Sequence, residues 1–324
     1  MSTKDAVLAA LMQAKGALSG EQLAQALGLS RNSVWKAVDQ LRQEGYAISA
    51  GTNRGYRLMQ APRHVTETGI RAQLGQHSLG CPMEVYDEID STNRRAREWA
   101  MAGAPEGALV IAREQTAGRG RFDRRFVSPR DAGVYMSLIL RPRWPAERSV
   151  LITSMTAVAV ARAVEKLSGA EAQIKWVNDV VLNGKKVCGI LCEAGLNFES
   201  GAMDHVVVGI GINVARQTFP PELEAIATSL GNVAPAPVDA NILVAEVLDQ
   251  MAELYRRLDP AEFMAEYRAR SNVLGRLVTV MRGDERFEAV AEAIDDEGGL
   301  LVRAGAGLVR LQSGEISIKL EDRG

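Results

Sequence analysis

Residues 173–191 read QIKWVNDVVLNGKKVCGIL, and this stretch decides the architecture of the middle of the chain. Two apolar runs flank Asn183-Gly184, the dipeptide most typical of a two-residue hairpin turn. Such a turn pairs Leu182 with Lys185 across the two strands. The stretch therefore predicts a β-hairpin with its turn at this dipeptide.

The predicted hairpin carries charged side chains on one face. The same register pairs Val181 with Lys186. Because side chains alternate along a strand, we expect Lys175, Asp179 and Lys186 to lie on one side of the sheet. Two cations and a carboxylate among apolar neighbours are costly unless they bind a ligand or pair with each other. We interpret Lys186 as functional and expect Lys185 to lie in water.

A second stretch, residues 114–129, reads EQTAGRGRFDRRFVSP. Four arginines and two glycines fall within residues 118–125, between predicted strands at 108–113 and 133–140. Glycines let a backbone close around a ligand, and arginines donate hydrogen bonds to carboxylates and phosphates. The alternative is a solvated basic loop that touches nothing. So many like charges repel one another unless they gather round an anion, which favours an anion site.

Helical and strand patterns alternate from residue 65 onward, as in an α/β or α+β domain. A strand predicted over 83–89 leads into Asp90-Ser91-Thr92-Asn93, which caps a helix that runs to about residue 102. A helix N-terminus with hydroxyl groups can bind an anion or a polar ring. Most serine and threonine caps, however, serve only to cap the helix and bind no ligand.

An apolar helix over 149–167 and a buried strand over 206–214 are expected to complete the core. Gly209 and Gly211 suggest a dinucleotide-binding fingerprint, but the third glycine and the following helix are missing, so we reject that interpretation. The three histidines are scattered along the chain, which argues against a histidine-based triad or metal site.

Length and composition indicate an ordinary globular protein. The chain has 324 residues, about two or three domains, and a 47% hydrophobic content. Its three cysteines show no CxxC spacing, which indicates a reducing compartment rather than disulfides or zinc. The amino terminus lacks a signal-peptide pattern, and the apolar run 149–161 is too short to span a bilayer. We therefore expect a cytoplasmic protein that does not enter membranes.

The amino-terminal residues predict a helix-turn-helix. Residues 20–26 form a short predicted helix capped by Ser19, and after a break at Gly28 a second helix over 31–44 is capped by Ser30. In this motif the second helix enters the DNA major groove by its N-terminal end. Residues 1–62 carry seven basic and four acidic side chains, hence a charge of +3, whereas the whole chain carries −2.

A hairpin follows the two helices. Predicted strands at 47–50 and 56–59 flank residues 51–55, and Arg54 and Arg57 would meet phosphates or a minor groove. Helices followed by such a hairpin make a winged helix.

The exposed face of the second helix is polar. Trp35 fits either a partly buried core position or a contact in the DNA groove, and we favour the core. The residues expected to contact DNA are Ser30, Arg31, Asn32, Ser33, Lys36, Gln40, Arg54 and Arg57. The alternative is a module that binds other proteins. The amide, hydroxyl and ammonium groups at the front of the helix favour DNA.

These motifs, in this order, resemble the bifunctional biotin protein ligase and biotin operon repressor family. The resemblance covers essentially the whole chain: a winged helix, the motif at 90–93, GRGR at 118–121, KW-x-ND and KK-x-x-GIL in the hairpin, GIGIN at 209–213 and a small carboxy-terminal domain.

The resemblance implies a multidomain α/β (α+β) fold. A winged helix-turn-helix would occupy residues 1–62, and a mixed-sheet biotin- and ATP-binding catalytic domain related to class II synthetases would occupy 63–270. An SH3-like β-barrel would occupy 271–324, where apolar and polar residues alternate in short strands. Ser313-Gly314-Glu315 matches the family's GGE turn near the nucleotide.

The implied reaction joins the carboxylate of biotin to the α-phosphate of ATP and then passes the biotinyl group to a lysine of the biotin carboxyl carrier protein of acetyl-CoA carboxylase. Charge neutralisation and positioning suffice for this chemistry, so no nucleophilic side chain is expected. Matching biotin positions are Ser91, Thr92, Asn93, Gln115, Gly118, Arg119, Gly120, Arg121 and Lys186.

Catalysis would depend on Arg119, Arg121 and Lys186. The positions that match the handling of ATP and Mg²⁺ are Phe126, Lys175, Asn178, Asp179 and Asn213, with Phe126 stacking on adenine and Asp179 as the metal ligand.

Three residues depart from the family pattern. Asp123 replaces a glycine and Phe126 a tryptophan of GRGR-x-GR-x-W-x-SP, and Val177 replaces the proline of KWPND. Asp123 adds a negative charge near phosphates. None of these departures removes Arg119 or Lys186, so activity is expected.

The resemblance also implies a repressor of biotin genes that binds operator DNA as a homodimer, with the adenylate as corepressor and sheet edges of the central domain as the contact. Three alternatives stay open: a biotin-sensing regulator with little ligase activity, a ligase whose winged helix does not bind DNA, and a lipoate ligase.

Overall fold

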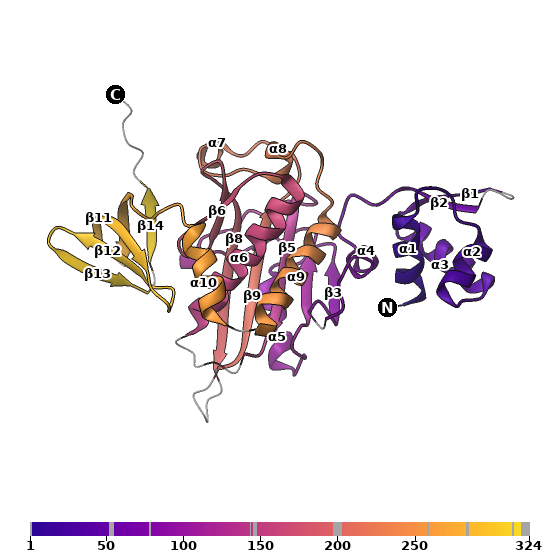
Figure 1. Ribbon diagram of the computed structural model, residues 1–324, viewed down its shortest axis with the longest axis horizontal. Coiled ribbons are helices and arrows are strands. Elements are labelled where there is room, and N and C mark those ends of the chain that lie inside the picture. The colour runs from indigo at the N-terminus through magenta and orange to yellow at the C-terminus, as the bar shows by residue number, and fades with distance from the viewer. Residues whose placement is uncertain are drawn as a thin grey trace.

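The computed structural model describes residues 2–51, 55–77, 79–142, 144, 148–196, 203–257, 259–282, 285–312 and 314–318. Its elements form an amino-terminal group, a large central group and a carboxy-terminal sheet, which lie in a row with the central group between the other two (Figure 1). No helix of the described residues is long and apolar enough to cross a membrane.

The amino-terminal group is a helix-turn-helix followed by a two-stranded antiparallel sheet, as predicted. Its elements are α1 (Thr3–Gln13), α2 (Gly20–Leu27), α3 (Arg31–Gln43), β1 (Ala47–Gly51) and β2 (Gly55–Gln60). Ser19 and Ser30 cap α2 and α3 by accepting hydrogen bonds from Gln22 N and Ser33 N, each at 3.0 Å. Gly28, at φ 66°, ends α2 in the left-handed conformation that favours glycine.

The central group contains a seven-stranded mixed sheet in the order β3-β4-β5-β9-β8-β7-β6. Its strands are β3 (Met83–Tyr86), β4 (Leu109–Ala112), β5 (Gly133–Leu140), β6 (Ala172–Lys175), β7 (Asp179–Leu182), β8 (Lys185–Leu196) and β9 (Met203–Asn213). β3 and β4 run parallel, and the other neighbours are antiparallel. The strand predicted over 83–89 is shorter than expected, because the chain bends after Tyr86 and Ile89 pairs with Gln115 in an isolated bridge.

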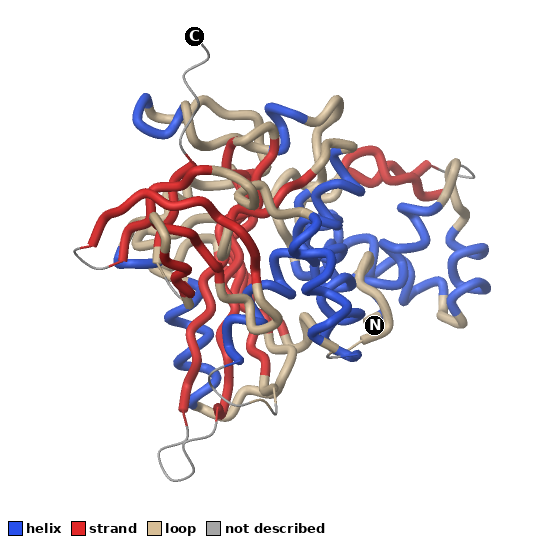
Figure 2. The backbone as a smooth tube through the Cα atoms, turned by 60° about the vertical axis from the view of Figure 1, so that its left-hand side comes forward, coloured by secondary structure: helices blue, strands red, loops and turns tan. Residues whose placement is uncertain are grey.

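Helices cover both faces of this sheet. The helices are α4 (Glu67–Arg71), α5 (Thr92–Met101), α6 (Ser149–Ser168), α7 (Pro221–Glu224), α8 (Leu230–Val233), α9 (Ala240–Arg257) and α10 (Pro260–Ala269). Along β4, Leu109 and Ile111 join the core that contains α6 and α9, whereas Val110 packs with the alanines of α5. This alternation puts α5 on the opposite face from α6. Figure 2 shows the helices, in blue, beside the red strands of the sheet.

The predicted hairpin register is confirmed: Leu182 pairs with Lys185, and Val181 with Lys186. Asn183 and Gly184 both have positive φ values, 50° and 76°, as a turn matching the twist of the strands requires. Lys185 does not simply lie in water, because its ammonium group donates a hydrogen bond to Glu224 O at 2.7 Å.

The carboxy-terminal sheet has five antiparallel strands in the order β13-β12-β11-β10-β14, which is the small barrel-like domain predicted. They are β10 (Leu277–Arg282), β11 (Glu285–Ile294), β12 (Leu300–Ala304), β13 (Gly307–Leu311) and β14 (Glu315–Ile318). The turn at 295–299 contacts the central group, where Trp176 Nε1 donates to Gly298 O at 2.9 Å. Ser313 of the predicted GGE-like turn lies outside the described residues.

Candidate functional site

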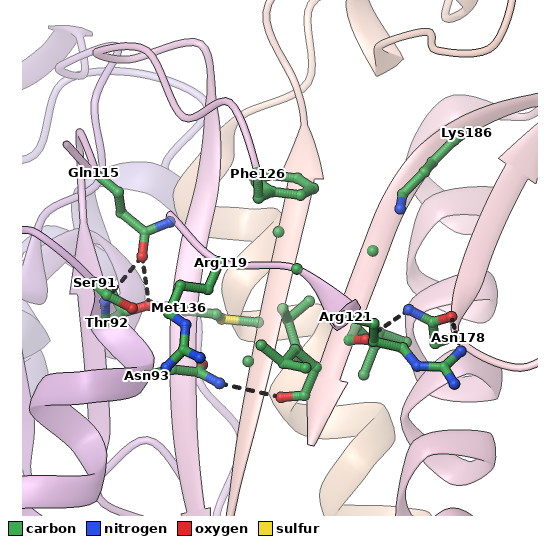
Figure 3. A pocket seen from close by; sticks show the side chains of 17 residues that line it. Ser91, Thr92, Asn93, Gln115, Arg119, Arg121, Phe126, Met136, Asn178 and Lys186 are labelled. Atoms are coloured by element: carbon green, nitrogen blue, oxygen red, sulfur yellow. Dashed lines mark hydrogen bonds between the residues drawn. The ribbon is translucent and has the colours of Figure 1, made fainter. Parts of the chain in front are cut away.

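A hollow opens on the face of the central sheet that also carries α5 (Figure 3). Apolar side chains of β8 and β9 such as Ile190 and Ile210 turn to the opposite face, into the core with α6. The alternate positions Gly189, Gly209 and Gly211 face the hollow and have no side chain to fill it. Small residues at alternating strand positions therefore create the space.

Two of these glycines make room for functional side chains. A Cβ atom at Gly209 would lie 2.1 Å from Asn93 Oδ1, and one at Gly211 would lie 2.6 Å from the Phe126 ring. Glycine is thus required here for close packing of an amide and an aromatic ring, which explains two glycines that do not belong to a dinucleotide fingerprint.

The first turn of α5 forms one wall. Ser91, Thr92 and Asn93 are each at least 96% buried, and Ser91 is the N-cap. The amide nitrogen and hydroxyl of Thr92 both donate to Gln115 Oε1, at 2.9 and 3.0 Å. The predicted motif at the start of α5 and the predicted Gln115 are therefore brought together by hydrogen bonds.

Behind this wall lie two residues that the sequence analysis missed. Ser137, fully buried on β5, donates to Asn93 Oδ1 at 2.6 Å and lies 2.8 Å from Thr92 Oγ1. Glu193 of β8 accepts a hydrogen bond from Asn93 Nδ2 at 2.8 Å. The two contacts fix which end of the Asn93 amide faces Ser137, since a carboxylate only accepts hydrogen bonds.

Glu193 also reaches the arginine-rich loop. Its Oε1 lies 3.9 Å from both Arg97 Nη1 and Arg119 Nη1. The carboxylate thus links the buried wall of the hollow to the loop that covers it. Alternation along β8 would have placed Glu193 on the same side as Gly189, but Asn93 is 100 residues away in sequence and could not be named in advance as its partner.

The loop between β4 and β5 forms the other wall. Arg121 donates to Asn178 Oδ1 at 3.2 Å, which joins the loop to the hairpin (Figure 3). The Arg121 guanidinium lies 4.9 Å from the centre of the Phe122 ring. Phe122 has a φ of 55° and is exposed, a strained conformation for a bulky residue.

The hairpin supplies a charged pair. Lys186 Nζ lies 2.7 Å from Asp179 Oδ1, so the prediction that these two residues share a face is confirmed. Burial raises the pKa of the neighbouring Cys188 thiol, which keeps it neutral in the core under the hairpin. Lys175 pairs with Asp179 in the strand register but does not line the hollow.

Most of the predicted site residues line this hollow. They are Ser91, Thr92, Asn93, Gln115, Arg119, Gly120, Arg121, Phe126, Asn178 and Lys186. Gly118, Lys175, Asp179 and Asn213 do not line it. Gly118 packs behind Phe126, since a Cβ atom there would lie 2.4 Å from Phe126 O.

Asn213 lies at the end of β9, and its assignment to ATP stays a prediction. Its Nδ2 donates to Thr228 O at 3.0 Å, and Thr228 N donates in turn to Lys186 O at 2.8 Å. Asn213 therefore holds a segment that runs beside Lys186.

The amino-terminal group presents a second surface. Arg31, Asn32, Lys36 and Gln40 are exposed on α3, and Ser33 is half-buried. The expectation for Trp35 is wrong: 54% of it is exposed, because Val34, Ala37, Val38 and Leu41 already fill the core side of the helix. Ser30 caps α3, Arg57 is exposed on β2, and Arg54 lies outside the described residues.

Within the described residues, no group of three or more histidine, cysteine, aspartate or glutamate side chains could hold a metal ion. The three cysteines are free thiols.

Three family profiles match three successive parts of the chain, which correspond to the three groups of elements in the fold. The profile of the biotin/lipoate A/B protein ligase family matches residues 85–213, a helix-turn-helix domain profile matches 3–57, and the biotin protein ligase C-terminal domain matches 273–319. The class defined by the fold and the pocket is therefore a biotin or lipoate protein ligase.

Curated relatives narrow this class. The bifunctional ligase/repressor BirA of Bacillus subtilis is 39% identical over 311 residues, which cover 93% of this chain and 94% of the relative. BirA of Escherichia coli is 28% identical and covers 94% of each chain. The chain belongs to the family of bifunctional biotin ligase/repressors.

A solved structure agrees. The biotin protein ligase from Aquifex aeolicus, in complex with biotin and ATP, superimposes with a TM-score of 0.63 at 28% identity and covers 73% of this chain and 98% of that one. The predicted family and fold class are thus confirmed.

Proposed function

We propose that this chain adenylates biotin and transfers it to a carrier protein. An oxygen of the biotin carboxylate attacks the α-phosphorus of ATP, and pyrophosphate leaves. The amine of a carrier lysine then attacks the acyl carbon of the biotinyl-AMP, and AMP leaves. The observation that carries the proposal is one hollow in which buried neutral donors and acceptors face Arg119, Arg121 and Lys186.

One wall of the hollow suits the ring of biotin, and the other suits its carboxylate. Ser91, Thr92 and Asn93 offer buried hydroxyl and amide groups, which match a neutral ring with its own donors and acceptors. Lys186 and Arg121 lie on the other side, where they would neutralise the carboxylate and the phosphate as charge develops. Catalysis would then come from positioning and charge.

Ligand entry requires the loop side chains to move. The free space in the hollow is about 60 Å³, below the roughly 300–1,000 Å³ typical of small-molecule pockets. The Phe126 ring and the loop arginines occupy part of it. We infer that Phe126 moves outward on binding and becomes available to stack on adenine.

Asp179 fits the Mg²⁺ that would accompany ATP. Magnesium is usually held by one or two carboxylates together with water and substrate phosphates. A single carboxylate beside Lys186 is enough for a metal that arrives with the nucleotide. When bound, the metal would neutralise phosphate charge.

The amino-terminal group is proposed to bind biotin-operator DNA when the adenylate is bound, in a homodimer formed through central-domain sheet edges. β3 and β6 are the edge strands of the central sheet. The polar front of α3, with Arg31, Asn32 and Lys36, would enter the major groove.

Domain boundaries at residues 62 and 270 are part of the same proposal. They fall between β2 and α4, and between α10 and β10. The cytoplasmic location remains a prediction supported by the three free thiols.

Incubation with labelled biotin, Mg-ATP and the apo carrier tests the ligase. Label on the carrier that depends on ATP is expected, and excess unlabelled biotin but not lipoate should remove it. No label would favour a regulator that only senses biotin, and equal competition by lipoate would overturn the choice of substrate. A mobility shift of biotin-gene promoter DNA that requires both biotin and ATP would exclude a ligase with an inert winged helix.

A further inference from the structure

Trp35 is the one large apolar side chain of α3 that stays outside the core. Its neighbours Val34 and Val38 are at most 1% exposed, whereas Trp35 is 54% exposed. Arg31 and Asn32, four and three residues earlier, lie on the same side of the helix. An indole that is more than half exposed is therefore presented to solvent among polar and basic groups.

The indole lines a hollow between α3 and the two-stranded sheet of β1 and β2. The hollow has a volume of about 780 Å³. Arg31, Asn32 and Trp35 form the wall on α3, and Ala50 and Tyr56 belong to the wall on the two-stranded sheet, which lies beside α3 in Figure 1. The N-terminal end of α2 also reaches this hollow, with Ser19, Gly20 and Glu21.

We propose that Trp35 reads thymine by packing its indole against the C5 methyl group in the major groove. Thymine is the one base that presents a methyl group there, and apolar side chains recognise it by contact. Asn32, one turn earlier on the same face, is placed to contact the edge of a neighbouring base. The inference rests on the proposed binding of operator DNA and names a feature of the sequence that is read.

DNA fits this surface better than a protein partner does. Arg31 lines the same hollow as the indole, Lys36 is also exposed on α3, and residues 1–62 carry a net charge of +3. The ion pair between Arg31 and Glu21, at 3.5 Å, joins side chains that are 75% and 74% exposed, so a phosphate can replace the carboxylate at little cost. An exposed indole at the centre of a basic, amide-bearing helix face matches a base edge bordered by phosphates.

Replacement of thymine by deoxyuridine tests the proposal, because it removes only the methyl group. The full chain, saturated with biotin and Mg-ATP, is used to select a duplex from a random pool. Its affinity is then measured for that duplex and for versions with single T→U changes. At one position per half-site, we expect a loss of about fourfold, the factor that burial of one methyl group contributes.

Trp35→Ala is expected to bind the thymine duplex about fourfold more weakly and to lose sensitivity to uracil at that position alone. Trp35→Phe, which keeps a ring, should retain most of the uracil penalty, and thermal unfolding checks that both variants fold. Gln43→Ala, also exposed on α3 but near its end, is the matched control and should behave as the parent.

Three outcomes would overturn the inference. The first is a wild-type protein indifferent to every T→U change, and the second is a Trp35→Ala variant that keeps the full uracil penalty. The third is a variant that binds DNA as tightly as the parent, which would point to a protein partner for the indole. If the parent selects no DNA at all, the proposed repressor function fails as well, and this result is distinct from the other three.

Discussion

The charged groups of the pocket are paired with one another, whereas those of the winged-helix face point into solvent. Lys186 lies 2.7 Å from Asp179, and these side chains are 36% and 21% exposed. On α3 the corresponding contact, between Arg31 and Glu21, is 3.5 Å long and about three-quarters exposed at both ends. The first arrangement is organised before a ligand arrives, and the second is an open electrostatic surface.

This difference predicts how the pocket and the winged-helix face respond to mutation and to salt. Short-range pairs in a half-buried hollow keep their geometry and are weakly screened by salt, so single changes there should have large effects. Exposed cations contribute small, additive and strongly salt-dependent amounts to nucleic-acid binding. The same chain would therefore use few residues for chemistry and many for DNA.

The largest effect is expected from Arg121→Ala. The variant should form biotinyl-AMP about 10²–10³-fold more slowly, the usual cost of removing one donor that stabilises developing charge. Single-turnover formation of the adenylate measures this rate. Arg125→Ala, in the same loop but not lining the hollow, is the matched control and should stay within about threefold of the parent. If the two variants lose activity alike, or if Arg121→Ala retains adenylate as tightly as the parent, the role of the loop is wrong.

The second-largest loss of activity is expected from Lys186→Gln. Loss of a charged hydrogen bond to the acid or phosphate is expected to lower kcat/KM for biotin by about 10–100-fold. The neighbouring Lys185→Gln removes the same charge from a side chain that donates to Glu224 O and does not line the hollow, and it should have little effect. Steady-state kinetics with both variants make the comparison, and a similar loss in both would show that overall charge, not position, matters.

Glu193→Ala tests whether a paired carboxylate inside the pocket positions Asn93. Without the carboxylate, Asn93 loses one hydrogen bond, and the KM for biotin should rise about fivefold while kcat changes little. Glu193→Gln keeps an acceptor for Asn93 and should recover most of the affinity. A fall in kcat at unchanged KM would contradict a positioning role on the biotin side of the pocket.

The smallest effect is expected on the wing. Arg57→Ala should weaken DNA binding a few-fold for specific and unrelated duplexes alike, and it should reduce the slope of log K against log salt by about 1. Binding isotherms at several salt concentrations give this slope. Met59→Ala, exposed on the same strand but uncharged, should leave the slope unchanged. A change confined to one DNA sequence would instead mean that Arg57 reads a base.

Local chemistry made much of the molecule predictable. Asn183-Gly184 dictated the register of the hairpin, and the serines at 19 and 30 marked the starts of α2 and α3. The family resemblance identified a set of site residues, and most of them line one hollow in the structure. Each of these inferences depended on neighbours in sequence or on a motif.

What could not be predicted depends on contacts between distant segments. Glu193 meets Asn93 only because β8 and α5 pack on the same face of the sheet. For Trp35 the core was favoured over a groove contact, but the core side of α3 is already filled by smaller residues. The hydrogen bond from Asn213 Nδ2 to Thr228 O, which holds the segment beside Lys186, likewise joins segments that no motif relates.

A single salt series on the full chain tests the central contrast most directly. Biotin affinity and, with biotin and Mg-ATP saturating, promoter-DNA affinity are measured between about 50 and 200 mM salt. The dissociation constant for biotin should change by less than about threefold, because the pocket charges act at short range. Affinity for DNA should fall by about a thousandfold along a straight line in log salt. Parallel losses, or DNA binding indifferent to salt, would contradict the division between a pre-paired pocket and an open, electrostatic DNA surface.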